Sequence, residues 1–81
     1  MLSVDYDPEF LKSLGKLDNS IKEKVKKQIQ KILENPEIGK PMKYVRKDTR
    51  EVYISPFRLS YAYIKHEDKI VFFELYHKDE Q

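Results

Sequence analysis

Basic side chains gather in one short segment of this chain, where they could contact an anionic partner. Residues 39–50 hold five cations against one acid, Asp48, an excess of four positive charges, whereas the whole 81-residue chain carries a net charge of +2. A local patch on a nearly neutral protein favours a directed contact with an anion over a general coating of nucleic acid. Lysines that keep a small protein in solution account for the pattern equally well. The five cations are Lys40, Lys43, Arg46, Lys47 and Arg50.

Arg58 and the two histidines are further candidates for chemistry on an anion. Arg58 lies in an otherwise apolar segment, and its planar guanidinium can hold two phosphate oxygens at once while it stays charged. The alternative is an exposed arginine paired with Glu74 across a sheet. His77 could act as a general acid or base near neutral pH, although its apolar neighbours favour a role in packing or hydrogen bonding. His66 lies beside two acids, which indicates an exposed polar turn.

The composition excludes several other kinds of site. Because the chain has no cysteine, neither a disulfide nor a thiolate zinc site can hold the fold. Two histidines are too few for a self-contained metal site, so we expect no metal and no other cofactor. The N-terminal residues lack the basic and apolar regions of a signal peptide, and no apolar run approaches the roughly 20 residues of a membrane-spanning helix. We therefore expect a cytoplasmic protein without a membrane partner.

The first half of the chain is expected to form a strand and a pair of helices. Residues 2–6 suit a short strand, and the Asp-Pro pair that follows is typical of a helix start. Ser20 and Glu23 fit a capping box that opens a second helix, and Asn35 ends this helix before a proline. The short break between the helices predicts an antiparallel hairpin. The apolar residues at helical spacing are Phe10, Leu11, Leu14 and Leu17, then Ile21, Val25, Ile29, Ile32 and Leu33.

The second half is rich in β-branched and aromatic residues, which favour strands. Its short connections predict a three-stranded antiparallel meander. The expected fold is therefore α+β: a short N-terminal strand, an antiparallel helical hairpin, then the meander forming one sheet, in a single domain over residues 1–81. The three strands are expected at residues 51–55, 57–65 and 69–77.

Alternation along the last strand predicts which side chains share a face. It places Phe72 on one face and Phe73, Leu75 and His77 on the other, with Lys78 opposite His77. Apolar side chains on both faces favour a partner on the face that the helices leave open. Aromatic side chains that cover this face themselves are the alternative.

This order of elements resembles the RelE/ParE superfamily of toxins from toxin–antitoxin modules. Four segments carry the resemblance, in the family's order and over nearly the whole chain. Residues 10–18 resemble the opening helix, and the Gly-Lys-Pro-Met-Lys-Tyr sequence of residues 39–44 resembles the segment that leads into the sheet. Residues 57–61 resemble the aromatic-Arg-x-x-Tyr strand, and residues 77–79 resemble the closing His-Arg/Lys-Asp. No single motif identifies the family, so the resemblance depends on the ordered set.

The resemblance implies a cytoplasmic toxin that is neutralised by a cognate antitoxin protein. RNA-cleaving members of the family bind the ribosome and cut messenger RNA in the decoding site, whereas ParE-like members poison DNA gyrase. A third reading is a catalytically inactive relative that only binds an antitoxin-like partner. The first reading, a ribosome-dependent RNA endonuclease that inhibits translation, is the one we favour.

The resemblance also assigns roles in RNA cleavage, which needs a base for the 2′-hydroxyl, a cation for the phosphorane and an acid for the 5′-oxygen. Arg58 matches an active-site arginine of RNA-cleaving relatives and is expected to clamp the phosphate. Lys78 matches a catalytic arginine of many relatives and is expected to stabilise the phosphate or the leaving group. Lys43 is a candidate base, and His77 a candidate acid or base. The expected contacts to the RNA backbone are Lys40, Arg46, Lys47 and Arg50.

The chain departs from the family pattern at three places. Relatives often carry arginines in the strand before the aromatic-Arg pair, where this chain has Glu51 and Tyr53. They also often carry a glycine in the following turn, where this chain has Ser55-Pro56. Many RNA-cleaving members end in a tyrosine that helps to activate the 2′-hydroxyl, and this chain ends without one. Tyr44, Tyr53 or Phe57 could stack on a base, and each is equally consistent with packing in the sheet.

Overall fold

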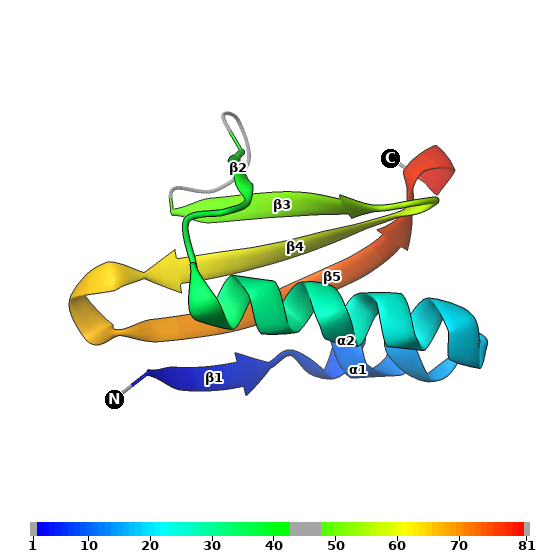
Figure 1. The fold of residues 1–81 in the computed structure, drawn as a ribbon, viewed down its shortest axis with the longest axis horizontal. Helices are drawn as coiled ribbons and strands as arrows, with labels where there is room; N and C mark the ends of the chain where they lie inside the picture. Colours follow the sequence, from blue (N-terminus) through cyan, green and yellow to red (C-terminus); the bar gives the residue numbers. More distant parts are fainter. Residues whose placement is uncertain (1, 43–47, 81) are drawn as a thin grey trace.

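The computed structural model describes residues 2–42 and 48–80, which form two α-helices and a five-stranded sheet (Figure 1). The predicted α+β class and order of elements are confirmed. The helices are α1 (Pro8–Gly15) and α2 (Asn19–Glu34). The strands are β1 (Ser3–Tyr6), β2 (Lys40–Pro41), β3 (Thr49–Ile54), β4 (Phe57–Ile64) and β5 (Lys69–His77). Short 3-10 turns, η1 (Lys65–Glu67) and η2 (Lys78–Glu80), follow β4 and β5.

The sheet has the order β1-β5-β4-β3-β2. Strands β3, β4 and β5 form the predicted antiparallel meander, and β1 pairs in parallel with the outer side of β5. Strand β2 adds a two-residue pairing beside β3, which the sequence pattern did not predict. Parallel strands need a long crossover connection between them and cannot be joined by a tight turn. Both helices and three strands lie between β1 and β5 in the chain, so these two strands can pair in parallel.

An aspartate directly before each helix caps it with its side chain. The Asp7 carboxylate accepts the Glu9 amide at 2.9 Å, as predicted for the first helix. The second helix is capped by Asp18, whose carboxylate accepts the Ile21 amide at 3.0 Å and the Ser20 hydroxyl at 2.7 Å. The predicted capping box at Ser20 is therefore wrong, since the preceding aspartate takes the cap position. In the described ranges, no helix combines the length and apolar character needed to cross a bilayer.

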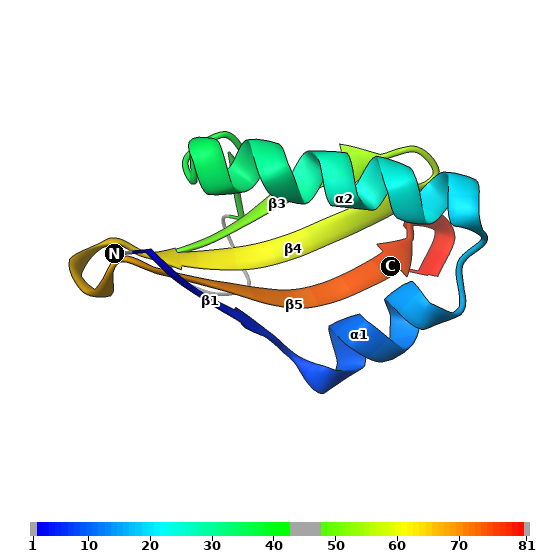
Figure 2. The ribbon, with the colours of Figure 1, turned by 60° about the horizontal axis from the view of Figure 1, so that its bottom comes forward.

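The core lies between the helices and one face of the sheet (Figure 2). Fully buried Phe10 of α1 and Val25 and Ile32 of α2 pack on buried strand residues such as Leu59 and Ile70. Four aromatic rings from three strands and α1 continue this layer with centroid separations of 5.4–6.0 Å, a spacing typical of stabilising aromatic pairs. These rings belong to Tyr6, Phe10, Tyr61 and Phe72.

A β-bulge in β5 changes which side chains face the core. The register pairs Tyr61 with Phe72 but Ser60 with Glu74, so Phe73 is an extra residue. Beyond the bulge, Leu75 therefore returns to the helix-covered face, where it is buried. His77, opposite Phe57, lies on this same face. The predicted grouping of Phe73, Leu75 and His77 opposite Phe72 is wrong, because strict alternation holds only in an unbroken strand.

Candidate active site on the uncovered face of the sheet

The face of the sheet opposite the helices is not covered by any helix of the described chain (Figures 1 and 2). Side chains alternate between the two faces along β3 and β4. Glu51 and Tyr53 of β3 therefore lie on this face, beside their register partners Ser60 and Arg58 of β4. Beyond the bulge, β5 adds Tyr76 to the same face. Polar and charged side chains are therefore concentrated on the side of the sheet that the core leaves open.

Arg58, Glu51 and Tyr76 form a hydrogen-bonded cluster on this face, with one residue from each strand of the meander. Arg58 Nη1 donates to Glu51 Oε1 at 3.2 Å, and the Tyr76 hydroxyl donates to Glu51 Oε2 at 3.2 Å. The register explains the cluster, because Arg58 lies directly opposite Tyr76 on β5 and diagonally opposite Glu51 on β3. The acid beside Arg58 is thus Glu51 on β3, and not Glu74, which the pairing alternative had named.

The cluster is partly open to solvent and holds charges of both signs. The side chain of Arg58 is 35% exposed and that of Glu51 is 22% exposed. A guanidinium has five N–H donors, and Glu51 is the acceptor that the described residues give to Arg58. Arg58 Nε is covered and has no acceptor in the described part of the chain. The cluster therefore combines a cation that can bind a phosphate, a carboxylate that can accept a proton, and a phenol.

Tyr53 flanks the cluster and is the most accessible large side chain near it. It lies opposite Arg58 in the register, and 55% of its surface is exposed. Its hydroxyl is 3.5 Å from Ser55 Oγ. Of the three aromatic residues considered for base stacking, Tyr53 presents its ring beside Arg58, Phe57 packs on His77, and Tyr44 lies outside the described residues.

His77 and Lys78 directly follow Tyr76 in the chain, but the His77 side chain points to the face of the sheet opposite the cluster. The His77 ring packs edge-on against Phe57, with a centroid separation of 5.5 Å, and Nδ1 accepts the Asp79 amide at 3.2 Å. This ring is on the helix-covered face, so the sheet separates it from Arg58. The Lys78 amide donates to the Pro56 carbonyl at 3.0 Å, which fixes the start of η2 beside the β3–β4 turn. The Lys78 side chain is exposed.

The structure describes only the two ends of the basic segment, residues 39–42 and 48–50. Lys40 lies in β2 and is exposed. Arg50 Nη1 donates to the carbonyl of Glu37 at 3.0 Å and to that of Gly39 at 2.8 Å, so its guanidinium binds the protein's own backbone. The other three cations, Lys43, Arg46 and Lys47, lie outside the described residues. The described residues therefore bring together Arg58, Glu51 and Tyr76, while the role of Lys43 as a candidate base stays a prediction.

Tyr61 fixes the chain between α2 and β2. Its buried hydroxyl accepts the Gly39 amide at 2.9 Å and donates to the Pro36 carbonyl at 2.7 Å. Burial raises the pKa of the Tyr61 phenol above its ordinary value. The sequence pattern placed Tyr61 in a strand without indicating this contact, since its partners are more than twenty residues away.

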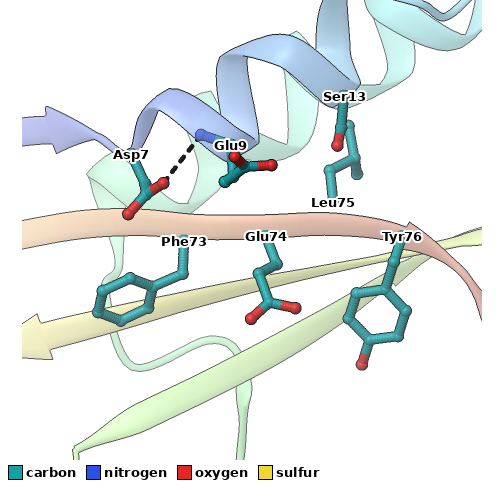
Figure 3. Close-up of a pocket in the computed structure, with 7 residues that line it drawn as sticks. All are labelled: Asp7, Glu9, Ser13, Phe73, Glu74, Leu75 and Tyr76. Atoms are coloured by element: carbon teal, nitrogen blue, oxygen red, sulfur yellow. Dashed lines mark hydrogen bonds between the residues drawn. The ribbon is translucent and has the colours of Figure 1, made fainter.

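A groove of about 320 Å³ lies between α1 and β5 (Figure 3). It starts where the Asp7 amide donates to the Phe72 carbonyl at 2.9 Å, which ends the pairing of β1 with β5. Figure 3 shows Phe73, Glu74 and Tyr76 directed to the same side of β5, away from α1. No group of three His, Cys, Asp or Glu side chains in the described ranges could hold a metal ion. The groove is lined by Asp7, Glu9, Ser13, Phe73, Glu74, Leu75 and Tyr76.

The helical pair packed on one face of a mixed five-stranded sheet is the architecture of RelE toxins. The chain belongs to the ParE toxin family of type II toxin–antitoxin systems, whose family model matches residues 4–81. It is accordingly a toxin of the RelE/ParE superfamily, as its motifs had indicated.

Several solved structures share this fold. The toxin of the intact E. coli RelBE toxin–antitoxin complex superposes with a TM-score of 0.83 at 24% identity, covering 95% of this chain and 96% of that one. The Mycobacterium tuberculosis RelBE2 complex gives 0.79 at 21% identity, with 95% and 98% covered. The archaeal RelE–RelB complex from Pyrococcus horikoshii gives 0.78 at 13% identity, with 99% and 98% covered. No curated protein sequence matches the chain significantly.

Proposed function

We propose that this toxin is a ribosome-dependent RNA endonuclease that cuts messenger RNA in the cytoplasm and so inhibits translation. The observation that carries the proposal is the position of Arg58 on the uncovered face. There it donates to the Glu51 carboxylate, which also accepts the Tyr76 hydroxyl. A permanently charged guanidinium is suited to the two non-bridging oxygens of a scissile phosphate. RNA cleavage by the 2′-hydroxyl also needs proton transfer, which a neighbouring carboxylate can supply.

Other basic residues are suited to hold the RNA backbone. Lys78 begins η2 next to the β3–β4 turn, at the same end of the sheet as Arg58. Exposed Lys40 lies at the start of the basic segment. Contacts of this kind position a nucleic acid without reading its sequence, which fits a toxin that depends on the ribosome to present its substrate.

Besides the ribosome and its messenger RNA, the proposed partner of the toxin is a cognate antitoxin protein. This proposal is supported by the family, which is defined by toxin–antitoxin pairs, and by relatives that were solved in complex with RelB. Binding to the folded toxin alone would also stabilise a small domain by mass action.

Primer extension on a reporter messenger RNA after brief induction of the toxin tests the proposed cleavage. We expect discrete cuts inside translated codons with the unmodified chain and their loss in Arg58→Ala. Lys65→Ala is the matched control, because its side chain is 79% exposed at the far end of β4 and pairs only with Glu37 among the described residues. Cuts that persist in Arg58→Ala at equal expression would remove Arg58 from the mechanism.

Inhibition of DNA gyrase is the second candidate function. It is favoured by the family model itself, which describes the ParE toxin of parDE modules, and by Glu51, which already balances the charge of Arg58. Arrested growth with intact messages would support this function, and a supercoiling assay with purified gyrase would then measure it directly. Normal growth with intact messages would indicate an inactive, antitoxin-binding relative.

A further inference from the structure

We propose that Glu51 is the general base of the cleavage reaction, an inference that rests on the proposed function. The required base must accept the proton of the 2′-hydroxyl beside the phosphate that Arg58 binds. Glu51 is in direct contact with Arg58, at 3.2 Å, and its side chain is partly exposed on the uncovered face. A carboxylate is an acceptor with room for about four hydrogen bonds, and the described residues supply two.

The positions of the other titratable side chains favour Glu51. His77 lies on the opposite face of the sheet, packed against Phe57. Glu74 is an exposed carboxylate on the same side of β5 as Tyr76, but Arg58 pairs with Glu51 and not with it. Lys78 carries a positive charge and so suits the phosphate better than it suits proton abstraction. Within the described chain, Glu51 is therefore the anionic acceptor next to the phosphate-binding arginine.

The geometry also explains how one arginine can serve both the base and the phosphate. The guanidinium is a rigid fork with donors on more than one edge. One donor, Nη1, is bound to Glu51, and the partly exposed remainder of the group can face the substrate. In RNA the 2′-oxygen is separated from the phosphorus only by two ribose carbons and the 3′-oxygen. A phosphate held by Arg58 therefore brings its 2′-hydroxyl near the carboxylate that Arg58 also holds.

The reaction step balances without any co-reactant. The 2′-oxygen forms a bond to phosphorus while its proton moves to a Glu51 carboxylate oxygen. The bond between phosphorus and the 5′-oxygen breaks, and the 5′-oxygen takes a proton from water. Glu51 then returns its proton to the solvent, so that the products are a 2′,3′-cyclic phosphate and a 5′-hydroxyl. Arg58 stabilises the charge that builds on the non-bridging oxygens in between.

Tyr76 is a positioning residue in this scheme. Its hydroxyl donates to Glu51 Oε2 at 3.2 Å, and Arg58 holds the other oxygen, so the carboxylate is fixed by donors from two different strands. Fixing the base in the geometry of attack lowers the cost of reaching the transition state. Removing the hydroxyl in Tyr76→Phe should slow cleavage about fivefold, the equivalent of one ordinary hydrogen bond, without removing the base.

The test measures single-turnover cleavage on purified ribosomes programmed with messenger RNA, as a function of pH, together with toxin affinity for the same ribosomes. For Glu51→Gln we expect a loss of at least about 100-fold in rate, unchanged affinity, and disappearance of the decline in rate toward acidic pH. Glu51→Asp, which keeps a carboxylate, should recover part of the rate. Glu74→Gln is the matched control, because it removes an equal charge from a side chain outside the cluster and should keep the normal rate and pH profile.

The outcomes separate the base from the function on which it depends. If the unmodified toxin does not cut, the proposed function fails before the role of Glu51 is reached. If it cuts and Glu51→Gln cuts equally fast or faster, the carboxylate only restrains Arg58 and the assignment is wrong. Loss of ribosome affinity or of the thermal unfolding transition together with activity would also overturn it, since Glu51 would then hold the structure and not the proton.

Discussion

The hydroxyl of Tyr61 in β4 accepts the amide of Gly39 at 2.9 Å, a contact that ties the end of the α2 connection to the centre of the sheet. The same hydroxyl donates to the Pro36 carbonyl at 2.7 Å, and Arg50 Nη1 reaches the Gly39 carbonyl at 2.8 Å. A Cβ on Gly39 would lie only 2.6 Å from the Tyr61 hydroxyl oxygen. This position accordingly requires glycine for the close approach of the two segments.

We predict that both partners of this contact are needed for stability. Tyr61→Phe should lower the free energy of unfolding by about 1–3 kcal/mol, because it leaves a buried amide without an acceptor. Gly39→Ala should cost about 1–3 kcal/mol through overpacking against Tyr61. Urea unfolding of each variant measures these losses. The pair Gly39→Ala with Tyr61→Phe should lose less than the sum of the two, since both changes disrupt the same contact between Gly39 and Tyr61; strict additivity would contradict this account.

The sequence predicted the elements whose signals are local. The apolar stripe that includes Val25 and Ile32 placed α2, because helical spacing puts these side chains on one face whatever they pack against. Asp7 before a proline placed the start of α1, and Asn35 before a proline placed the end of α2. The cap of α2 could not be predicted from the sequence, because Asp18 and Ser20 are both good caps and only the backbone geometry decides between them.

The parts that depend on pairing between strands could not be predicted from local patterns. The bulge at Phe73 follows from how β5 pairs with β4, and it reverses the face of every later residue of the strand. The cluster of Arg58, Glu51 and Tyr76 needs the register of three strands at once. A charge in an otherwise apolar segment indicates Arg58 as a functional residue. The sequence marks its partner Glu51 only as a departure from the family pattern.

The cap at Asp18 should make stability depend on pH. Hydrogen bonds from the Ile21 amide and the Ser20 hydroxyl lower the pKa of the Asp18 carboxyl below its usual range. Because the folded-state pKa is lowered, this contribution is present above the unfolded pKa of about 3.9 and is lost as pH falls through the folded-state value. We expect Asp18→Ala to melt at a lower temperature at neutral pH. Asp18→Asn, which keeps the cap, should melt at a temperature that varies less between neutral and acidic pH; an unchanged pH dependence would contradict the assignment.

Tyr53 is predicted to stack on a base of the bound messenger RNA. The residue is 55% exposed and lies opposite Arg58, so a nucleotide whose phosphate contacts Arg58 would have its base within reach. Stacking on an aromatic ring is worth about 1–3 kcal/mol per base, so Tyr53→Ala should weaken binding to programmed ribosomes by this amount while the unfolding midpoint changes little. Tyr53→Phe should bind normally. A stability loss in Tyr53→Ala that matches the loss of affinity would show that the ring serves packing alone.

Binding to programmed ribosomes should weaken steeply as salt is added. Each cation that neutralises a phosphate releases counterions, which contributes about 0.7–0.9 to the slope of log affinity against log salt. Exposed Lys40 in β2 and Lys78 at the start of η2 are the described cations expected to make such contacts. Lys40→Gln and Lys78→Gln should each reduce the slope by nearly one unit, whereas Lys65→Gln, at the opposite end of β4, should leave it unchanged. A slope that is flat for the unmodified toxin would remove the basic residues from substrate binding and favour a mode of inhibition that needs no grip on nucleic acid.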